Sequence, residues 1–259
     1  MSTTARRAPR RPVSRFSLPL VLAFGCLATP LTLTGQEAQE APKNLQVLPK
    51  DMSRREVFQV MRGFALGLGV RCTTCHVGEE GQPFSTYDFA SDDKAMKRKA
   101  REMLKMVGAI NGTYLAELPN RREPNVGVTC VTCHRGVRRP EPIQSIVTRT
   151  VESDGVDAAL AKYRELRDQY YGSAAYDFTD MPLLDAAEAL RDDADATRRV
   201  LELNLEFNPN SAPTLFALAQ VHADAGDKDQ AIDLLRRSLE ILPENPRAQR
   251  LLRELTGGL

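Results

Sequence analysis

The chain has 259 residues, of which 42% are hydrophobic and 27% charged, a balance typical of globular proteins and not of disordered ones. Its formal net charge of +1 gives no general affinity for nucleic acid or anionic lipid, so neither is predicted as a partner. The charge is divided unevenly, because basic residues outnumber acidic ones by 17 to 13 in residues 36–144, whereas acidic residues outnumber basic ones by 21 to 13 in residues 145–259. This division predicts two modules with different surfaces.

Residues 1–35 are predicted to be an export signal peptide. Five arginines precede an apolar run over Phe16–Leu33, and small and polar residues follow it. Pro19 and Pro30 interrupt the run, which favours a cleaved signal over a permanent membrane span. The alternative is a lipoprotein anchor at Cys26, although one lipid chain alone binds a membrane weakly. Both readings predict an exported protein, in the periplasm or on the outer face of the cell membrane.

Two helices are predicted in the first module. The first begins at Ser53, where the sequence Ser-Arg-Arg-Glu fits a capping box, and it ends at Gly67 and Gly69. The second runs from about Asp92 to Ile110 and is expected to stop at Asn111–Gly112. Both carry apolar side chains at helical spacing.

A domain boundary is predicted at Pro140 and Pro142. It separates a domain at residues 36–145 from a second domain at residues 146–259. Beyond the boundary we expect a helix over Val156–Tyr170. A 34-residue period then begins near Phe178, and such a period indicates stacked helical hairpins.

The clearer copy of this period starts at Ala212 and resembles a tetratricopeptide repeat in its small, large and proline positions. The preceding copy is degenerate, because Thr197 and Asn204 stand where the pattern has other residues. His222 falls at a packing position of the clearer copy and is predicted to lie in the core. No segment with strand-like alternation competes with helix, so the predicted fold class is all-α.

Two Cys-x-x-Cys-His sequences carry the spacing of c-type haem attachment. Two thiols at this spacing can form thioethers with the two vinyl groups on one edge of a porphyrin, and the adjoining imidazole then reaches the iron. We therefore predict two covalently attached haem c groups. The attachment residues are Cys72, Cys75 and His76 in the first motif, and Cys130, Cys133 and His134 in the second.

Paired cysteines have two other common uses. Zinc sites use such pairs, but zinc would leave the histidine after each pair unexplained. Redox disulfides of the thioredoxin type occur in a βαβ context, which the helical pattern does not offer. Export also places the cysteines in an oxidising compartment. The haem interpretation is favoured over both.

Each iron needs a sixth ligand or an open position. The chain has three histidines, of which two are already used, so methionine is the predicted partner. Met61 lies on the first predicted helix and Met103 on the second, with Met106 one turn further on as the alternative to Met103. A His/Met pair raises the reduction potential of a haem.

The residues that carry a family resemblance are Met61–His76, Arg101–Asn111 and Gly127–Gly136. They resemble the cytochrome subunit of purple-bacterial photosynthetic reaction centres over roughly Asn44–Pro142. The resemblance implies that each haem follows a helix that supplies its axial methionine, which supports Met61 and Met103. Family subunits carry four attachment motifs, whereas this chain has two, and the histidine ligand that they carry after the second helix is absent here.

The sequence thus predicts a two-haem electron carrier with redox protein partners, such as a membrane-bound reaction centre or respiratory complex. The acidic repeat module would dock a partner. A haem enzyme such as a di-haem peroxidase, or an assembly scaffold with accessory haems, is the alternative. A cationic run on the second helix is predicted to be a solvated face or to steer an acidic partner. Its residues are Lys94, Lys97, Arg98, Lys99 and Arg101.

Overall fold

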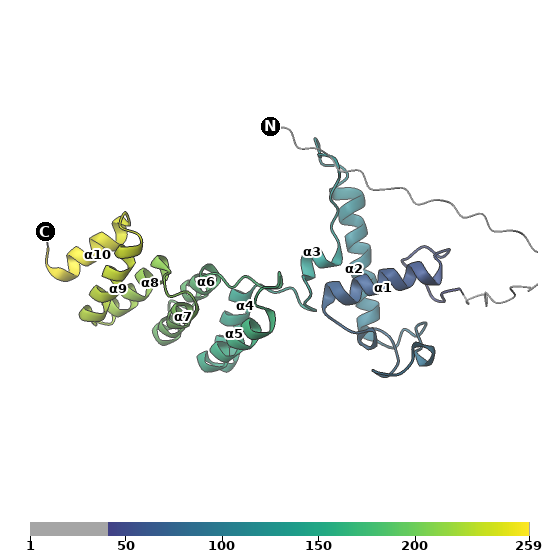
Figure 1. Cartoon of the computed structure of the whole chain (residues 1–259), viewed down its shortest axis with the longest axis horizontal. Coiled ribbons are helices and arrows are strands. Elements are labelled where there is room, and N and C mark those ends of the chain that lie inside the picture. The colour runs from purple at the N-terminus through teal and green to yellow at the C-terminus, as the bar shows by residue number, and fades with distance from the viewer. Residues whose placement is uncertain (1–40, 259) are drawn as a thin grey trace, which may run out of the picture. The chain divides into compact units, whose positions relative to one another are not determined.

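The fold is all-α, as predicted. A computed structural model describes residues 41–258, and within this range one isolated bridge, between Val77 and Asp88, is the sole strand-like pairing. The predicted export signal and the alternative lipoprotein anchor at Cys26 lie outside the described residues. No helix in residues 41–258 is long and apolar enough to cross a membrane. The α-helices (Figure 1) are α1 (Arg54–Leu68), α2 (Ala95–Ala109), α3 (Cys130–His134), α4 (Ile143–Asp154), α5 (Val156–Tyr170), α6 (Met181–Ala189), α7 (Ala194–Phe207), α8 (Ala212–Asp224), α9 (Lys228–Ile241) and α10 (Pro246–Thr256).

Helix α1 has the predicted start. The backbone N–H of Ser53 donates to the Glu56 carboxylate at 2.8 Å, and the N–H of Glu56 donates to the Ser53 hydroxyl at 3.3 Å, which completes the capping box. Gly69 ends the helix in the left-handed conformation, with φ of 63°, a geometry that glycine adopts without strain. Gly67 lies inside the helix and is buried there.

Helix α2 differs from the prediction at both ends. It begins at Ala95 rather than Asp92, and it does not stop at Asn111–Gly112, because the chain continues as a π-helical turn over Ile110–Tyr114. The Asn111 side chain does not cap the helix. Its amide group is used instead by the backbone of Val128, seventeen residues further on. Two long-range hydrogen bonds therefore occupy the Asn111 side chain, which the local sequence had predicted to end the helix.

Hydrophobic burial is concentrated in the second half of the described chain. Every buried hydrophobic side chain in residues 41–258 lies at or beyond Val137. Helices α4–α10 share one core, with Leu183, Leu215 and Leu235 fully buried at its centre. Residues 41–136 have no comparable core.

The two predicted repeats both fold as helical hairpins, formed by α6 with α7 and by α8 with α9. Thr197 and Asn204, the residues that weaken the earlier copy in sequence, are buried but hydrogen-bonded. Thr197 donates to the carbonyl of Leu190 at 2.7 Å, and the Asn204 amide donates to the Thr214 hydroxyl at 2.8 Å. Satisfied polar groups are tolerated in a core. Helix α5 has the predicted bounds, and the domain limits at residue 145 stay a prediction.

Candidate haem site

The first attachment motif forms a tight turn after α1. Cys72–Thr74 is a short 3-10 helix, and the backbone N–H of His76 donates to the carbonyl of Cys72 at 2.9 Å. This turn keeps both thiols and the imidazole on one compact segment. His76 is 9% exposed and is the buried histidine of the described residues.

The surroundings of His76 favour a neutral imidazole. The Phe89 ring packs edge-on against it, with ring centroids 5.1 Å apart. Burial, together with the nearby charge of Lys97, lowers the pKa of His76. The buried Nδ1 atom has no hydrogen-bond partner within residues 41–258. A metal ligand must be the neutral imidazole, so burial prepares this side chain for iron.

The second attachment motif is the one-turn helix α3. Thr129 caps it, and the hydroxyls of Thr129 and Thr132 lie 3.1 Å apart. The Nδ1–H of His134 donates to the carbonyl of Val137 at 3.0 Å. This bond fixes the tautomer that leaves Nε2 with a free electron pair, as in most metal-ligating histidines.

The four cysteines within residues 41–258 are free thiols, three of them half-buried and Cys133 exposed. Burial raises the pKa of the Cys75 and Cys130 thiols, whereas reactive redox cysteines have a lowered pKa. In residues 41–258 the cysteines are not gathered with other ligands into a group of three or more. The thiols are therefore placed as two separate pairs, each beside its own histidine.

A close crossing joins the two motifs. The N–H of Gly136 donates to the carbonyl of Gly67 at 2.9 Å, and a Cβ atom at Gly67 would lie 3.3 Å from the Cβ of Cys130. The end of α1, which leads directly into the first motif, thus packs against α3, which carries the second. The sequence patterns did not predict this contact, although glycines at positions 67, 69 and 136 beside the motifs were a usable signal.

A second contact, made by the Asn111 side-chain amide, fixes the backbone just before the second motif. The amide donates to the carbonyl of Val128 at 2.8 Å and accepts from the N–H of Val128 at 2.7 Å. This pair fixes the end of α2 to the residues just before Cys130. The family resemblance included Asn111, but its partner was not foreseen.

The candidate axial methionines lie on the two expected helices. Met61 is half-buried on α1. Met103 and Met106 on α2 are each 45% exposed. Equal exposure gives no ground to choose between them, and all three ligand assignments stay predictions.

The first half of the chain exposes the kind of surface that a porphyrin can cover. Large apolar side chains stand in solvent there, among them Phe58 at 52%, Leu66 at 70% and Val131 at 55% exposed. Covering such a side chain contributes about 1.5–3 kcal/mol. An apolar disc attached through the adjoining thiols would fit this surface, so the residues present suit haem c.

The cationic run on α2 is not simply a solvated face, and that prediction is wrong in part. The side chains of Lys97 and Arg101 are only 11% and 13% exposed, and both pair with Asp92. They are unavailable for steering a partner because the turn over residues 88–92 covers them. Arg98 and Lys99 remain exposed.

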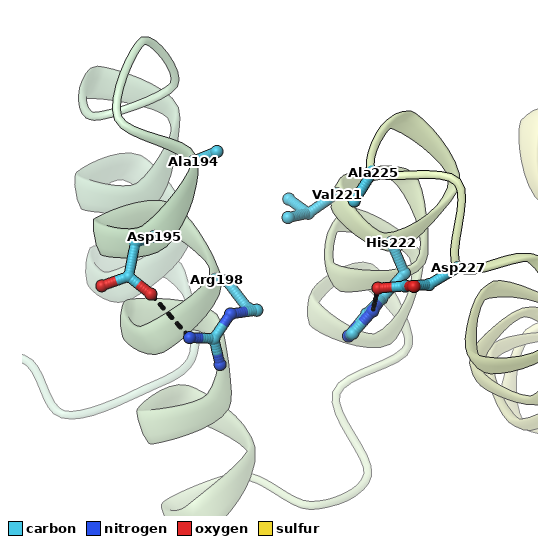
Figure 2. A pocket seen from close by; sticks show the side chains of 7 residues that line it. All are labelled: Ala194, Asp195, Arg198, Val221, His222, Ala225 and Asp227. Atoms are coloured by element: carbon cyan, nitrogen blue, oxygen red, sulfur yellow. Dashed lines mark hydrogen bonds and ion pairs between the residues drawn. The ribbon is translucent and has the colours of Figure 1, made fainter.

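His222 is half-buried rather than part of the core, which corrects the prediction. Its side chain is 16% exposed, and Nδ1 lies 3.4 Å from the Asp227 carboxylate. It lines a pocket of about 270 Å³ between α7 and α8, where Arg198 pairs with Asp195 (Figure 2). At His222 the repeat pattern calls for a packed side chain, but here that position lines the gap between the α6–α7 hairpin and the α8–α9 hairpin.

The sequence profile of the photosynthetic reaction centre cytochrome C subunit family matches residues 27–201. The match covers more than half of the chain. The chain belongs to this family. Family membership indicates covalently bound haem c, and the two cysteine pairs fit this. A tetratricopeptide repeat profile matches residues 182–244, which include most of α6–α9.

Two curated relatives contain matching segments. The photosynthetic reaction center cytochrome c subunit of Thermochromatium tepidum is 35% identical over 117 residues, or 44% of this chain and 25% of that protein. Cytochrome c-554 of Chloroflexus aurantiacus is 36% identical over 92 residues, or 35% of this chain and 20% of that protein. The match thus spans a quarter or less of each relative.

Two solved structures resemble part of the chain. The first tetratricopeptide repeat of Spaghetti (RPAP3), bound to an HSP90 peptide, has 15% identity and a TM-score of 0.32, and it covers 44% of this chain and 88% of that one. MamA has 17% identity and a TM-score of 0.31, covering 44% and 62%.

Proposed function

We propose that the chain is an exported cytochrome with two haem c groups, and that it carries single electrons between redox proteins. The main observation behind this proposal is that two separate thiol pairs each lie beside a histidine that is suited to bind iron through a ring nitrogen. Family membership supports the cofactor class. The number of haems and the role of each ligand are part of the proposal.

In the proposed mechanism each side chain has one task. Cys72 and Cys75 would hold one haem through sulfur, and His76 would hold its iron as a neutral imidazole. Cys130, Cys133 and His134 would do the same for the second, with the Val137 carbonyl orienting the His134 ring. Met61 and Met103 would complete the coordination, with Met106 as the alternative to Met103. Bound haem supplies a one-electron couple.

The crossing of α1 and α3 supports electron exchange within the chain. The Gly67–Gly136 hydrogen bond holds the two attachment segments against each other, so the two cofactors would be tethered to adjoining backbone. A close tether shortens the path between them without any further protein motion. An electron could then enter the chain at one haem and leave it at the other.

The repeat module is proposed to dock a redox partner, such as a membrane-bound reaction centre or a respiratory complex. Its support is the acidic excess in residues 145–259 and the repeat profile over residues 182–244. Repeat hairpins commonly present an extended surface to proteins. The partner proteins are expected to present basic surfaces.

Mass spectrometry of the exported protein tests the proposal. We expect the mass of two haems on the chain, with one lost in the Cys72→Ser/Cys75→Ser variant and the other in Cys130→Ser/Cys133→Ser. A chain secreted without added porphyrin mass would refute the proposal. Ferric spectra separate the carrier from the peroxidase alternative, because a high-spin haem that binds cyanide quickly would indicate catalysis.

A further inference from the structure

Two nearly buried cations lie beside the first attachment motif. The Lys97 ammonium is 3.0 Å and the Arg101 guanidinium 2.8 Å from the same Asp92 carboxylate oxygen. Gln46 donates to the other Asp92 oxygen at 3.1 Å. Hydrogen bonds from Arg101, which contributes most, and from Asn44 and Lys97 hold the pKa of Asp92 well below its usual range, so its carboxylate is ionised at neutral pH.

The Lys97 ammonium is tied to the wall of the His76 site. It donates to the backbone carbonyls of Phe89, Ala90 and Ser91 at 3.0, 3.0 and 2.7 Å. Phe89 is the residue whose ring packs on His76. Lys97 thus fixes the segment that covers the imidazole, and its charge is held there because the ammonium cannot swing into solvent.

A third cation contacts the motif itself. The Lys94 ammonium donates at 2.8 Å to the carbonyl of Thr73, which lies between the two cysteines of the first motif. Asp92 is the partly buried carboxylate of this segment, whereas Asp88 and Asp93 are exposed, and water screens exposed charges strongly. The partly buried charges are thus three cations against one carboxylate, which leaves positive charge at this motif.

The second motif is held mainly by neutral groups, which are the Thr129–Thr132 cap, the Asn111 amide on Val128 and the Val137 carbonyl on His134. One partly buried cation, Arg121, donates to the Val126 carbonyl at 2.7 Å, four residues before Cys130. The arginines that follow it, Arg135, Arg138 and Arg139, are exposed, and water screens exposed charges strongly. The two motifs therefore differ in fixed charge although their sequences are alike.

Fixed positive charge in a partly buried site opposes the extra positive charge of ferric iron and favours the ferrous form. We propose that Lys97 and Arg101 hold the first haem at a higher reduction potential than the second, which makes the first motif the electron acceptor within the chain. This inference rests on the proposed function, since it requires haem on both motifs.

A redox titration of the haem-loaded full-length chain tests the inference. The Cys72→Ser/Cys75→Ser variant identifies which of the two steps belongs to the first haem. In the wild type that step should have the higher midpoint. Lys97→Gln should lower the ratio of ferrous to ferric first haem at least tenfold at a fixed potential, a midpoint shift of about 59 mV for a one-electron couple.

Three matched variants complete the test. Lys105→Gln removes the same charge from an exposed part of α2, where Lys105 pairs with Glu102, and should leave both midpoints in place. Lys97→Arg keeps the charge and should retain the wild-type midpoint. Asp92→Asn removes a negative charge and should raise the midpoint of the first haem. This variant tests the inference by itself if Lys97→Gln does not bind haem.

Some results would overturn the inference while leaving the proposed function intact. These are two bound haems with the first at the lower potential, no shift in Lys97→Gln, or an equal shift in Lys105→Gln. Absence of haem from the wild-type chain would instead refute the proposed function, and the mass spectrum shows this before any titration begins.

Discussion

The crossing of α1 and α3 allows one sharp prediction, the substitution Gly69→Ala. Gly69 has a φ of 63°, and an L-residue with a side chain pays about 1–2 kcal/mol in this left-handed conformation. A Cβ atom there would also overlap the carbonyl oxygen of Gly136. Relief of that overlap separates the helices and breaks the Gly136–Gly67 hydrogen bond, a further loss of about 0.5–1.5 kcal/mol.

We therefore expect Gly69→Ala to destabilise the half that carries the two cysteine motifs by about 1.5–3.5 kcal/mol. Urea unfolding of the loaded chain, followed by haem absorbance, measures this. A urea slope of about 1–3 kcal/mol/M converts the loss into a midpoint lower by roughly 0.5–3.5 M.

Gly63→Ala is the matched control, because a Cβ atom at Gly63 meets nothing within 4 Å. Alanine in that helical position should stabilise the protein by about 0.5–1 kcal/mol. Equal or higher urea resistance in Gly69→Ala than in the wild type would show that the crossing does not form as described.

Four further outcomes are expected. Met61→Ala should turn the first haem high-spin and lower its midpoint, seen in ferric spectra. Asn111→Ala removes both hydrogen bonds to Val128 and should cost about 1–3 kcal/mol in the haem-monitored transition. Asn204→Leu leaves the Asp180 carbonyl without the amide that binds it at 2.9 Å and should cost about 1–3 kcal/mol in the circular dichroism transition of the repeats. His222→Ala should leave both haem spectra unchanged.

Each of these has a clear contrary result. An unchanged low-spin spectrum in the Met61 variant would remove it as a ligand, and loss of a haem band in the His222 variant would make that histidine one. If the haem-monitored transition of the Asn111 variant is as stable as that of the wild type, its two hydrogen bonds to Val128 are dispensable. Equal stability of the Asn204 variant would mean that its hydrogen bonds contribute nothing net.

Local sequence signals predicted the elements whose determinants are local. The Ser53 capping box and the left-handed Gly69 fix α1 by contacts within a few residues of each end, and the 34-residue period predicted the repeat hairpins. The proposed haem-binding residues rest on a spacing that the attachment chemistry itself demands, and they stay a prediction. Helical periodicity, without strand-like alternation, was enough to predict the all-α fold class.

The missed features depend on contacts between distant segments. Asn111 has the chemistry of a helix stop, but Val128 competes for its amide and the helix widens into a π-turn. Lys97 and Arg101 look like a solvated stripe until the turn over residues 88–92 folds across them. Periodicity along one helix carries no information on which other segment covers it.

The uneven distribution of buried side chains bears on how the protein is made. Helices α4–α10 enclose a hydrophobic interior of their own, so that half can reach its native state before any cofactor arrives. The cysteine-bearing half leaves large apolar side chains exposed and would gain its interior from the proposed haems. We expect thioether bonds to form while the cysteine-bearing half is incompletely folded and the C-terminal half is already folded. Chains that receive no haem should be degraded from their N-terminal side.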